Sequence, residues 1–277
     1  MINYSIIIPH HNSPDLLNRL LKSIPQRSDI EIIVVDDCSD ENGRPQIERE
    51  GVETIYVTKE ETKGAGRARN IGLKKATGKW LLFADCDDYY INNAFDEFDK
   101  VKDSDYDIIF FDYDTNLNSG KTAFSTRLNQ MLSGGKRDRA NFKHMSNAPW
   151  NKMYKRTFVI ENNIQFEEIP IQNDAYFVHK ASSLTDNFHY INEKLYYYEI
   201  NDKGVTLKKR KKEDIERSIT TTIRTDKLKA KSGAWDCIYA FISKKYKIDY
   251  GNIFYYKQQT RRIWHGLLFY ILRKYTI

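Results

Sequence analysis

Three carboxylates lie within four positions at Asp85-Cys86-Asp87-Asp88, directly after the uncharged run Trp80–Ala84. Like charges this close repel one another unless a cation or bound donors offset them. Mg2+ and Mn2+ take hard oxygen ligands and commonly bridge a carboxylate to a substrate diphosphate. The spacing therefore predicts a metal–diphosphate site at Asp85 and Asp87. The alternative is an ordinary polar turn or helix cap, where aspartate is also common.

A second acidic cluster, Asp36-Asp37-Cys38-Ser39-Asp40, follows another apolar run, Ile30–Val35. Both runs are typical of strands that are buried on both faces of a parallel sheet. The carboxyl ends of parallel strands lie along one edge, and ligands of open α/β sheets bind beyond that edge. We therefore expect the two clusters to line one crevice.

Strands and helices alternate in the first half of the chain. Strand-like runs occur at residues 4–8, 30–35, 52–57, 80–84 and 108–111, and helical patterns lie between them at 14–24, 64–76 and 93–102. Gly78 is in a position to close the second of these helices. Such alternation predicts an α/β fold with a mostly parallel sheet and helices on both faces.

The composition is that of a globular protein without membrane spans. The chain has 277 residues, of which 40% are hydrophobic and 30% charged. No apolar run reaches the roughly 20 residues that span a bilayer, and the N-terminus lacks the features of a signal peptide. The three scattered cysteines, Cys38, Cys86 and Cys237, suggest a reducing compartment. We therefore expect a cytoplasmic protein.

Four blocks occur in a fixed order along the chain. They are Ile-Ile-Ile-Pro-His-His-Asn (6–12), Val-Val-Asp-Asp-Cys-Ser-Asp (34–40), Ala-Arg-Asn-Ile-Gly-Leu (68–73) and Phe-Ala-Asp-Cys-Asp-Asp (83–88). Over about residues 4–200 the chain resembles the family 2 glycosyltransferases, which have the Rossmann-like GT-A fold. The resemblance implies an inverting enzyme that uses Mn2+ or Mg2+ and moves a sugar from a nucleotide-sugar donor to a hydroxyl.

The resemblance also implies roles for residues at the nucleotide. Pro9, His11 and Asn12 would border the base, while Asp36 and Asp37 would contact the uracil and the ribose. The family often has tyrosine at the position of His11.

The diphosphate side of the donor site is implied in the same way. Asp85, Cys86 and Asp87 would form the DxD motif of the donor site, with Asp85 near the ribose or metal and Asp87 as a metal ligand. Arg69, independently of the resemblance, is placed to neutralise the diphosphate at a helix N-terminus, where backbone amides favour anions; the alternative is a pair of arginines, Arg67 and Arg69, on the helix surface. The family usually has glycine at the position of Cys38, so we expect an unusual backbone angle there.

The catalytic base of the family lies at the start of a later helix, in a Glu-Asp-x-x-Phe pattern. Asp174 and Phe177 match this pattern, and Asn173 replaces the glutamate. A carboxylate at this point would accept the proton of the acceptor hydroxyl. The alternative for Asp174 is a helix N-cap. Glu168 is expected to contact the acceptor or to orient Asp174.

The segment Asn147–Arg156 is similar to a motif of bacterial family members that build surface polysaccharides. Trp150, in this segment, has two interpretations. It would either form a platform for the sugar ring of the acceptor or anchor the acceptor half to the sheet as a core residue.

The last third of the chain is basic. Lys208–Lys212 precedes a helical pattern at 213–230, and residues 253–275 mix aromatic with basic side chains. This pattern resembles an interfacial helix that would make a peripheral membrane contact at the inner face of the cell membrane, beside a lipid-linked acceptor. Packing on the catalytic domain, or on a second subunit in a homodimer, is the alternative. No nucleic-acid partner is expected.

These observations divide the chain into a catalytic domain, 1–200, and a basic helical extension, 201–277. The donor-binding half would cover about 1–115 and the acceptor half about 116–200. The sequence predicts a metal-dependent inverting glycosyltransferase that moves a sugar, expected to come from a UDP-sugar, to a saccharide or lipid-linked saccharide in bacterial polysaccharide or capsule biosynthesis.

Two alternatives to this function stay open. A sugar nucleotidyltransferase would need a glycine-rich phosphate loop after the first strand, where residues 9–12 contain no glycine. A catalytically silent carbohydrate- or membrane-binding module would need no base at Asp174.

Overall fold

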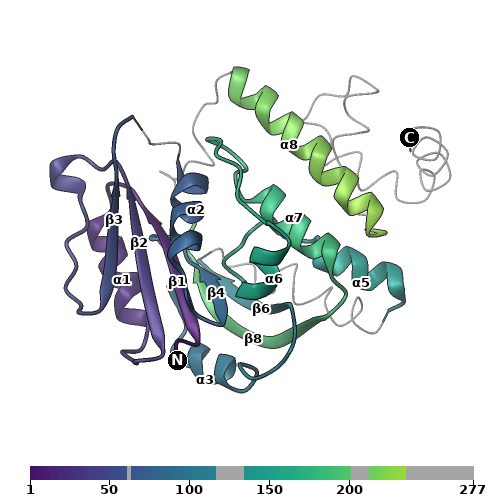
Figure 1. Cartoon of the computed structure of the whole chain (residues 1–277), viewed down its shortest axis with the longest axis horizontal. Helices are drawn as coiled ribbons and strands as arrows, with labels where there is room; N and C mark the ends of the chain where they lie inside the picture. The colour runs from purple at the N-terminus through teal and green to yellow at the C-terminus, as the bar shows by residue number, and fades with distance from the viewer. Residues whose placement is uncertain (61–63, 117–133, 201–211, 235–277) are drawn as a thin grey trace. The chain divides into compact units, whose positions relative to one another are not determined.

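The strands pair into one mixed sheet in the order β3-β2-β1-β4-β7-β6-β8-β5. Figure 1 shows its first four strands, β3, β2, β1 and β4, beside one another. The computed structural model describes residues 1–60, 64–116, 134–200 and 212–234. The strands are β1 (Tyr4–His10), β2 (Ile30–Asp37), β3 (Val52–Val57), β4 (Trp80–Phe83), β5 (Tyr89–Tyr90), β6 (Ile108–Thr115), β7 (Lys152–Lys155) and β8 (Phe188–Tyr198).

The first four strands of the chain give the sheet its parallel part. β3, β2, β1 and β4 are neighbours and all run parallel, as the apolar runs predict. Beyond them β7 pairs antiparallel with both β4 and β6, β8 is parallel to β6, and β5 is antiparallel to β8. The sequence analysis did not identify β7, because its four residues, Lys-Met-Tyr-Lys, lack the β-branched residues typical of strands.

Helices cover both faces of the sheet, which confirms the predicted α/β architecture. They are α1 (Pro14–Ser23), α2 (Ala65–Lys75), α3 (Ala94–Asp99), α5 (Lys136–Lys143), α6 (Arg156–Glu161), α7 (Ala175–Leu184) and α8 (Lys212–Lys231), with a 3-10 turn at Glu41–Gly43. One core cluster joins α1 and α3 to the sheet, and the other joins α2, α6 and α7 to it. Because successive strand residues face opposite sides, each buried strand contributes to both clusters.

Helix α8 and the sheet belong to one compact unit, and this unit covers Met1–Cys237. The helix packs along α7, so the expected boundary at residue 200 differs from the boundary of this unit. Lys208–Lys211 and residues 253–275 lie outside the described residues. Among the helices that are described, none is both long and apolar enough to cross a bilayer.

Gly78 does not close α2, contrary to the expectation from its position. The helix ends at Lys75, with Ala76 at its C-cap. Gly78 instead packs against the backbone of β1. A Cβ at Gly78 would lie 2.6 Å from Ser5 Oγ and 2.8 Å from Ser5 N. The glycine is therefore explained by close packing between the loop and the strand.

One buried cation faces the α7 side of the sheet. Lys152 on β7 is 1% exposed, and its Nζ donates to Ala148 O at 2.6 Å and to Asn151 Oδ1 at 2.7 Å. Burial lowers the pKa of Lys152 to about 7, against the opposing effect of nearby Asp174. The folded chain therefore releases this proton more easily than the unfolded chain does.

We predict that Gly78→Ala destabilises the fold. A Gly→Ala change in an unstrained position stabilises by about 0.4–1 kcal/mol through the unfolded state, but the contacts with Ser5 should outweigh this gain and cost about 1–3 kcal/mol. Urea unfolding measures the difference. Gly135→Ala is the control, because nothing lies within 4 Å of a Cβ there. Equal midpoints for the two variants would contradict the packing argument.

We also predict that Lys152 makes stability depend on pH. The folded-state pKa of about 7 lies below the ordinary 10.5, so between these values the unfolded chain binds more protons. The free energy of unfolding should therefore rise with pH in that window, by at most about 1.4 kcal/mol per pH unit from this group. The rise should disappear in Lys152→Met and persist in Lys155→Met. Urea unfolding at pH 7, 8, 9 and 10 tests this, and parallel curves for all three proteins would refute it.

Candidate active site

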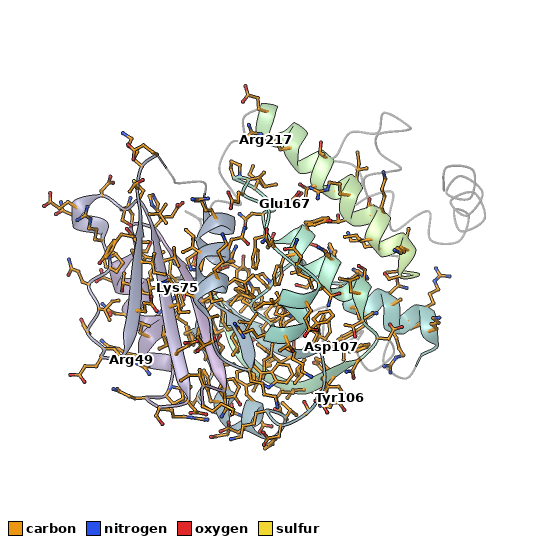
Figure 2. All side chains as sticks on the ribbon, in the orientation of Figure 1. Arg49, Lys75, Tyr106, Asp107, Glu167 and Arg217 are labelled. Carbon is orange, nitrogen blue, oxygen red and sulfur yellow. The ribbon has the colours of Figure 1, made fainter. Side chains whose placement is uncertain are left out.

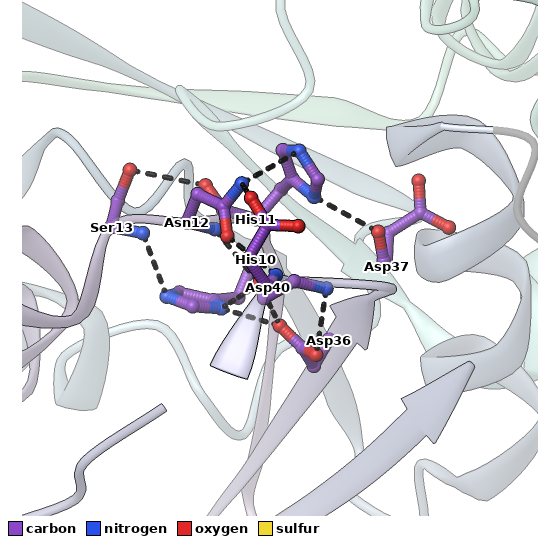
Figure 3. A network of polar contacts seen from close by, with 8 residues as sticks. His10, His11, Asn12, Ser13, Asp36, Asp37 and Asp40 are labelled. Atoms are coloured by element: carbon purple, nitrogen blue, oxygen red, sulfur yellow. Dashed lines mark hydrogen bonds and ion pairs between the residues drawn. The ribbon is translucent and has the colours of Figure 1, made fainter. Parts of the chain in front are cut away.

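The ends of β1 and β2 are joined by a buried hydrogen bond between His10 and Asp36 (Figure 3). His10 and Asp36 are register partners, and His10 Nδ1 lies 2.7 Å from Asp36 Oδ1. The Ser13 N–H donates to His10 Nε2 at 3.3 Å, so Nδ1 carries the proton of a neutral ring and donates to the carboxylate. Ser39 donates to both Asp36 oxygens, through Oγ at 2.5 Å and through N at 3.2 Å.

These contacts change the expectation for Asp36. Its carboxylate is 2% exposed, and both of its oxygens already accept hydrogen bonds within the protein. Asp36 therefore holds the loops after β1 and β2 in place. The geometry favours a positioning role over direct contact with uracil.

Asp37 faces the other way, and its carboxylate points away from the His10–Asp36 pair (Figure 3). Asp37 Oδ1 is buried and has no hydrogen-bond partner among the described residues, a cost that a ligand donor can remove. His11 Nδ1 donates to the Asp37 carbonyl oxygen at 3.0 Å. Asn12 is fixed beside it, since its N–H donates to Ser39 Oγ at 2.8 Å. Pro9 ends the apolar part of β1 just before this loop.

The backbone angle at Cys38 is unusual, as expected. Its φ is +60°, in the left-handed region that costs a residue with a Cβ roughly 1–2 kcal/mol. The tight turn that follows brings Ser39 back onto Asp36. The turn therefore has the geometry for which the family usually has glycine.

The loop after β4 contains one carboxyl group that is fully buried. Asp88 Oδ2 accepts the Tyr196 hydroxyl at 2.9 Å, and Asp88 Oδ1 accepts the Glu199 N–H at 2.9 Å. Tyr196 Oη in turn accepts the Asp85 N–H at 3.1 Å. Burial, together with Asp85 and Asp87, raises the pKa of Asp88 to about 9. Asp88 therefore fixes the loop, while Asp85 and Asp87 stay partly exposed.

The surroundings of Asp87 fit a cation. Burial and the neighbouring Asp85 raise the pKa of Asp87, and Arg19 only partly offsets them. Arg19 donates to the Asp87 carbonyl oxygen and, at 2.5 Å, to Glu199 Oε2. Burial and the flanking aspartates raise the pKa of Cys86 to about 12, which keeps its thiol neutral and unsuited to metal binding.

Asp85 and Asp87 do not form a complete metal site by themselves. Among residues 1–60, 64–116, 134–200 and 212–234, no group of three His, Cys, Asp or Glu side chains converges in a way that could hold a metal ion. Mg2+ sites of enzymes commonly use one or two carboxylates and complete their coordination with substrate phosphates and water. The two carboxylates fit such a shared site.

Arg69 joins the loop after β4 to the segment before α7. This side chain is 5% exposed. Its Nη2 donates to Asp85 Oδ1 at 2.5 Å and its Nη1 to Asn173 Oδ1 at 2.8 Å. The guanidinium also lies 5.4 Å from the centre of the Phe166 ring. Arg69 therefore connects the predicted metal ligand to the residue beside the predicted base.

Asp174 lies at the same edge of the sheet as this connection. It occupies the N-cap position of α7, but its side chain makes no capping hydrogen bond. Burial raises the pKa of Asp174, Arg69 lowers it and Asp85 raises it. The carboxyl group is thus within electrostatic reach of the loop after β4, and the simple N-cap interpretation does not account for it.

Glu168 is oriented by α2. Its Oε2 accepts Arg67 Nη1 at 3.4 Å and its Oε1 accepts Asn70 Nδ2 at 3.5 Å. These contacts hold the carboxylate on the segment before α7, close in sequence to Asp174.

Trp150 is a core residue, the second of its two interpretations. It is 7% exposed and stacks on Tyr196 at 5.0 Å and on Tyr198 at 5.1 Å between ring centres. Its aromatic area is largely used in packing, so the sugar-platform role is not supported. Trp150 instead supports Tyr196, which positions the loop after β4.

Sequence reasoning did not identify Arg19, Tyr196 or Glu199 as parts of this site. Arg19 and Glu199 are 180 positions apart, and Tyr196 is 111 positions from Asp85. No local pattern marks such contacts. The only local indication of these three residues is the acid cluster after β4, because buried carboxyl groups need hydrogen-bond partners from elsewhere in the chain.

Comparisons with known proteins agree with this geometry. The model of "Glycosyl transferase family 2" matches residues 5–162, more than half of the chain. The poly(ribitol-phosphate) beta-N-acetylglucosaminyltransferase TarS of Staphylococcus aureus is 29% identical over 215 residues, which cover 74% of this chain and 36% of TarS. The putative glycosyltransferase EpsH of Bacillus subtilis is 24% identical over 220 residues, 75% of this chain and 64% of EpsH.

Solved structures share the fold. The crystal structure of S. aureus TarS 1-349 in complex with UDP-GlcNAc superposes with a TM-score of 0.67 at 18% identity, covering 91% of this chain and 77% of that one. The mannosyltransferase PcManGT of Pyrobaculum calidifontis, in complex with GDP-Man and Mn2+, gives 0.54 at 14% identity, covering 84% and 74%. The chain spans about a third of full-length TarS. Because the family model covers more than half of the chain, including the loops after β1, β2 and β4, the chain belongs to the family 2 glycosyltransferases.

Proposed function

We propose that the chain transfers a sugar from a UDP-sugar to a hydroxyl of a saccharide or lipid-linked saccharide, with inversion, in bacterial surface-polysaccharide biosynthesis. The observation that carries this proposal is Arg69, which hydrogen-bonds both Asp85 and Asn173 and so joins the predicted metal ligand to the predicted base. Several relatives support the pathway, among them TarS and a putative teichuronic acid biosynthesis glycosyltransferase, TuaG, of B. subtilis.

The uridine part of the donor would lie against the loops after β1 and β2. Asp37 offers a buried acceptor oxygen without a partner among the described residues, which suits a donor group such as a uracil N–H or a ribose hydroxyl. His11 and Asn12 border it. The TarS structures with UDP and with UDP-GlcNAc support uridine as the base.

Asp85 and Asp87 would hold the metal, Mn2+ or Mg2+, together with the donor diphosphate. The ion would stabilise the negative charge that develops on the leaving diphosphate. Arg69 keeps Asp85 oriented, and Arg19 fixes the loop through the Asp87 carbonyl oxygen. These contacts preorganise the charged edge before the donor arrives.

Asp174 would act as the base. The acceptor oxygen attacks the anomeric carbon opposite the diphosphate, the bond from that carbon to the phosphate oxygen breaks, and the acceptor proton passes to Asp174. A single displacement of this kind inverts the anomeric centre, through a transition state that resembles an oxocarbenium ion. The pKa of Asp174 is raised and therefore lies closer to neutral pH, which favours proton transfer from the acceptor hydroxyl.

The remaining expectations stay proposals. A lipid-linked acceptor, peripheral membrane contact at the cytoplasmic face and a homodimer all rest on the basic residues that follow α8 or precede it. A sugar nucleotidyltransferase is disfavoured, because β1 leads into α1 through His11-Asn12-Ser13, without a glycine-rich phosphate loop.

We predict that Asp174→Asn strongly slows transfer without weakening donor binding. Loss of a general base lowers rates roughly 10²–10⁴-fold, and the amide keeps the size of the side chain. Turnover is followed as UDP release from UDP-GlcNAc and UDP-Glc with short saccharide acceptors, and UDP affinity by calorimetry. The control is Asp105→Asn, whose carboxylate is exposed. An unchanged rate in Asp174→Asn would remove Asp174 as the base.

We further predict that UDP stabilises the protein more strongly with Mn2+ than with EDTA. A ligand at 100 times its Kd contributes about 2.7 kcal/mol by mass action, and the shared carboxylate–diphosphate site makes the metal part of that affinity. Thermal shifts with UDP, GDP and TDP measure the effect. Asp87→Asn should lose the Mn2+-dependent increment and the exposed control Asp103→Asn should keep it. Identical shifts with Mn2+ and EDTA would count against a metal role.

A further inference from the structure

Helix α8 contacts the loop that carries the predicted base. This base loop, residues 162–174, connects α6 to α7. We propose that α8 holds the base loop in its catalytic position and that Arg224 is the positioning residue, acting through Glu167. The inference rests on the proposed function, because it assigns Asp174 on that loop as the base.

Glu167, labelled in Figure 2, joins the base loop to α8 through two contacts. Its side chain is only 14% exposed and forms an ion pair with Arg224. Thr221 Oγ1 donates to Glu167 Oε2 at 2.7 Å. Both carboxylate oxygens are therefore held by one face of α8, which fixes the direction of the side chain as well as its charge.

Two further contacts extend this face of α8. Thr222 Oγ1 donates to Gln172 Oε1 at 3.3 Å, and Gln172 has a left-handed φ of +57°. The Arg224 guanidinium lies 4.1 Å from the centre of the Tyr176 ring, in the first turn of α7. Arg224 thus touches the base loop on one side of Asp174 and α7 on the other.

The base loop transmits this contact toward Asp174. The Glu167 N–H donates to Asn173 O at 3.0 Å, which closes the loop on itself. On its far side the loop packs against α2, where a Cβ at Gly66 would lie 2.0 Å from Glu167 O. The loop is therefore confined between α2 and α8. Asn173, the residue before the base, is also held by Arg69.

If α8 only covered the base loop, replacing Arg224 would leave turnover unchanged. Exposed ion pairs add little to stability, and Arg224 is itself half-exposed, so its loss should leave the fold intact. Catalysis is more sensitive, because a displacement of about 1 Å in a reacting group can cost up to about 100-fold in rate. A positioning role therefore lowers turnover without lowering donor affinity.

The test uses the full chain with Arg224→Gln, and Lys227→Gln as a matched control, since Lys227 is an exposed cation on the same helix. We expect kcat for UDP release from UDP-GlcNAc to fall roughly 10–100-fold, with KM and UDP affinity within twofold of the wild type. Arg224→Lys should recover part of the rate. The double variant Arg224→Gln/Glu167→Gln should have the same kcat as Arg224→Gln alone, because both substitutions remove the same ion pair.

Hydrogen–deuterium exchange provides a readout that is independent of activity. Faster exchange confined to residues 162–174 in Arg224→Gln supports the inference, and Thr221→Val serves if that variant does not fold. Unchanged exchange in this loop overturns it, as does a loss of UDP affinity in step with kcat. If the wild type releases no UDP from any sugar nucleotide, the proposed function fails, and the exchange result alone decides whether α8 restrains the loop.

Discussion

The buried guanidinium of Arg69 is the interaction on which the charged edge of the sheet depends. Removing a cation from water is costly unless good partners replace the lost hydration. Asp85 and Asn173 supply those partners. Asn173 is neutral, so Asp85 is the only carboxylate that hydrogen-bonds Arg69 among the described residues. The side chain therefore ties the position of Asp85 to that of the segment before α7, and a shift of either segment would leave a buried charge without a partner.

The other acids at this edge divide into two groups. Asp36 and Asp88 are buried and satisfied within the protein, by His10 and Ser39 in one case and by Tyr196 and the Glu199 backbone in the other. They shape the loops. Asp37 Oδ1 has no hydrogen-bond partner among the described residues, and at Asp87 the effect of burial and of Asp85 on the pKa is only partly offset by Arg19. The ligand-binding capacity of the edge thus lies with the second group, although the two kinds of acid look alike in the sequence.

The parts of this fold that the sequence predicts are those with a local signal. The parallel strands β1, β2 and β4 contain apolar runs, and the placement of the acids at the ends of β2 and β4 follows from the rule that such strands end at one edge. The left-handed turn at Cys38 could be expected from the family resemblance. β7, in contrast, lacks a strand composition, and the burial of Trp150 depends on Tyr196 and Tyr198, whose positions only the folded sheet determines.

Long-range polar contacts explain the remaining differences, and α8 illustrates why. Its segment Ile219-Thr220-Thr221-Thr222-Ile223 is a run of β-branched residues, which are poor helix formers. Leucine or alanine would make a more stable helix. The hydroxyl groups of Thr221 and Thr222 instead reach Glu167 and Gln172, so the weak helical propensity is offset by contacts made about 50 positions away. A boundary drawn from composition at residue 200 separates the two partners of these contacts, because composition records the propensity and not the partner.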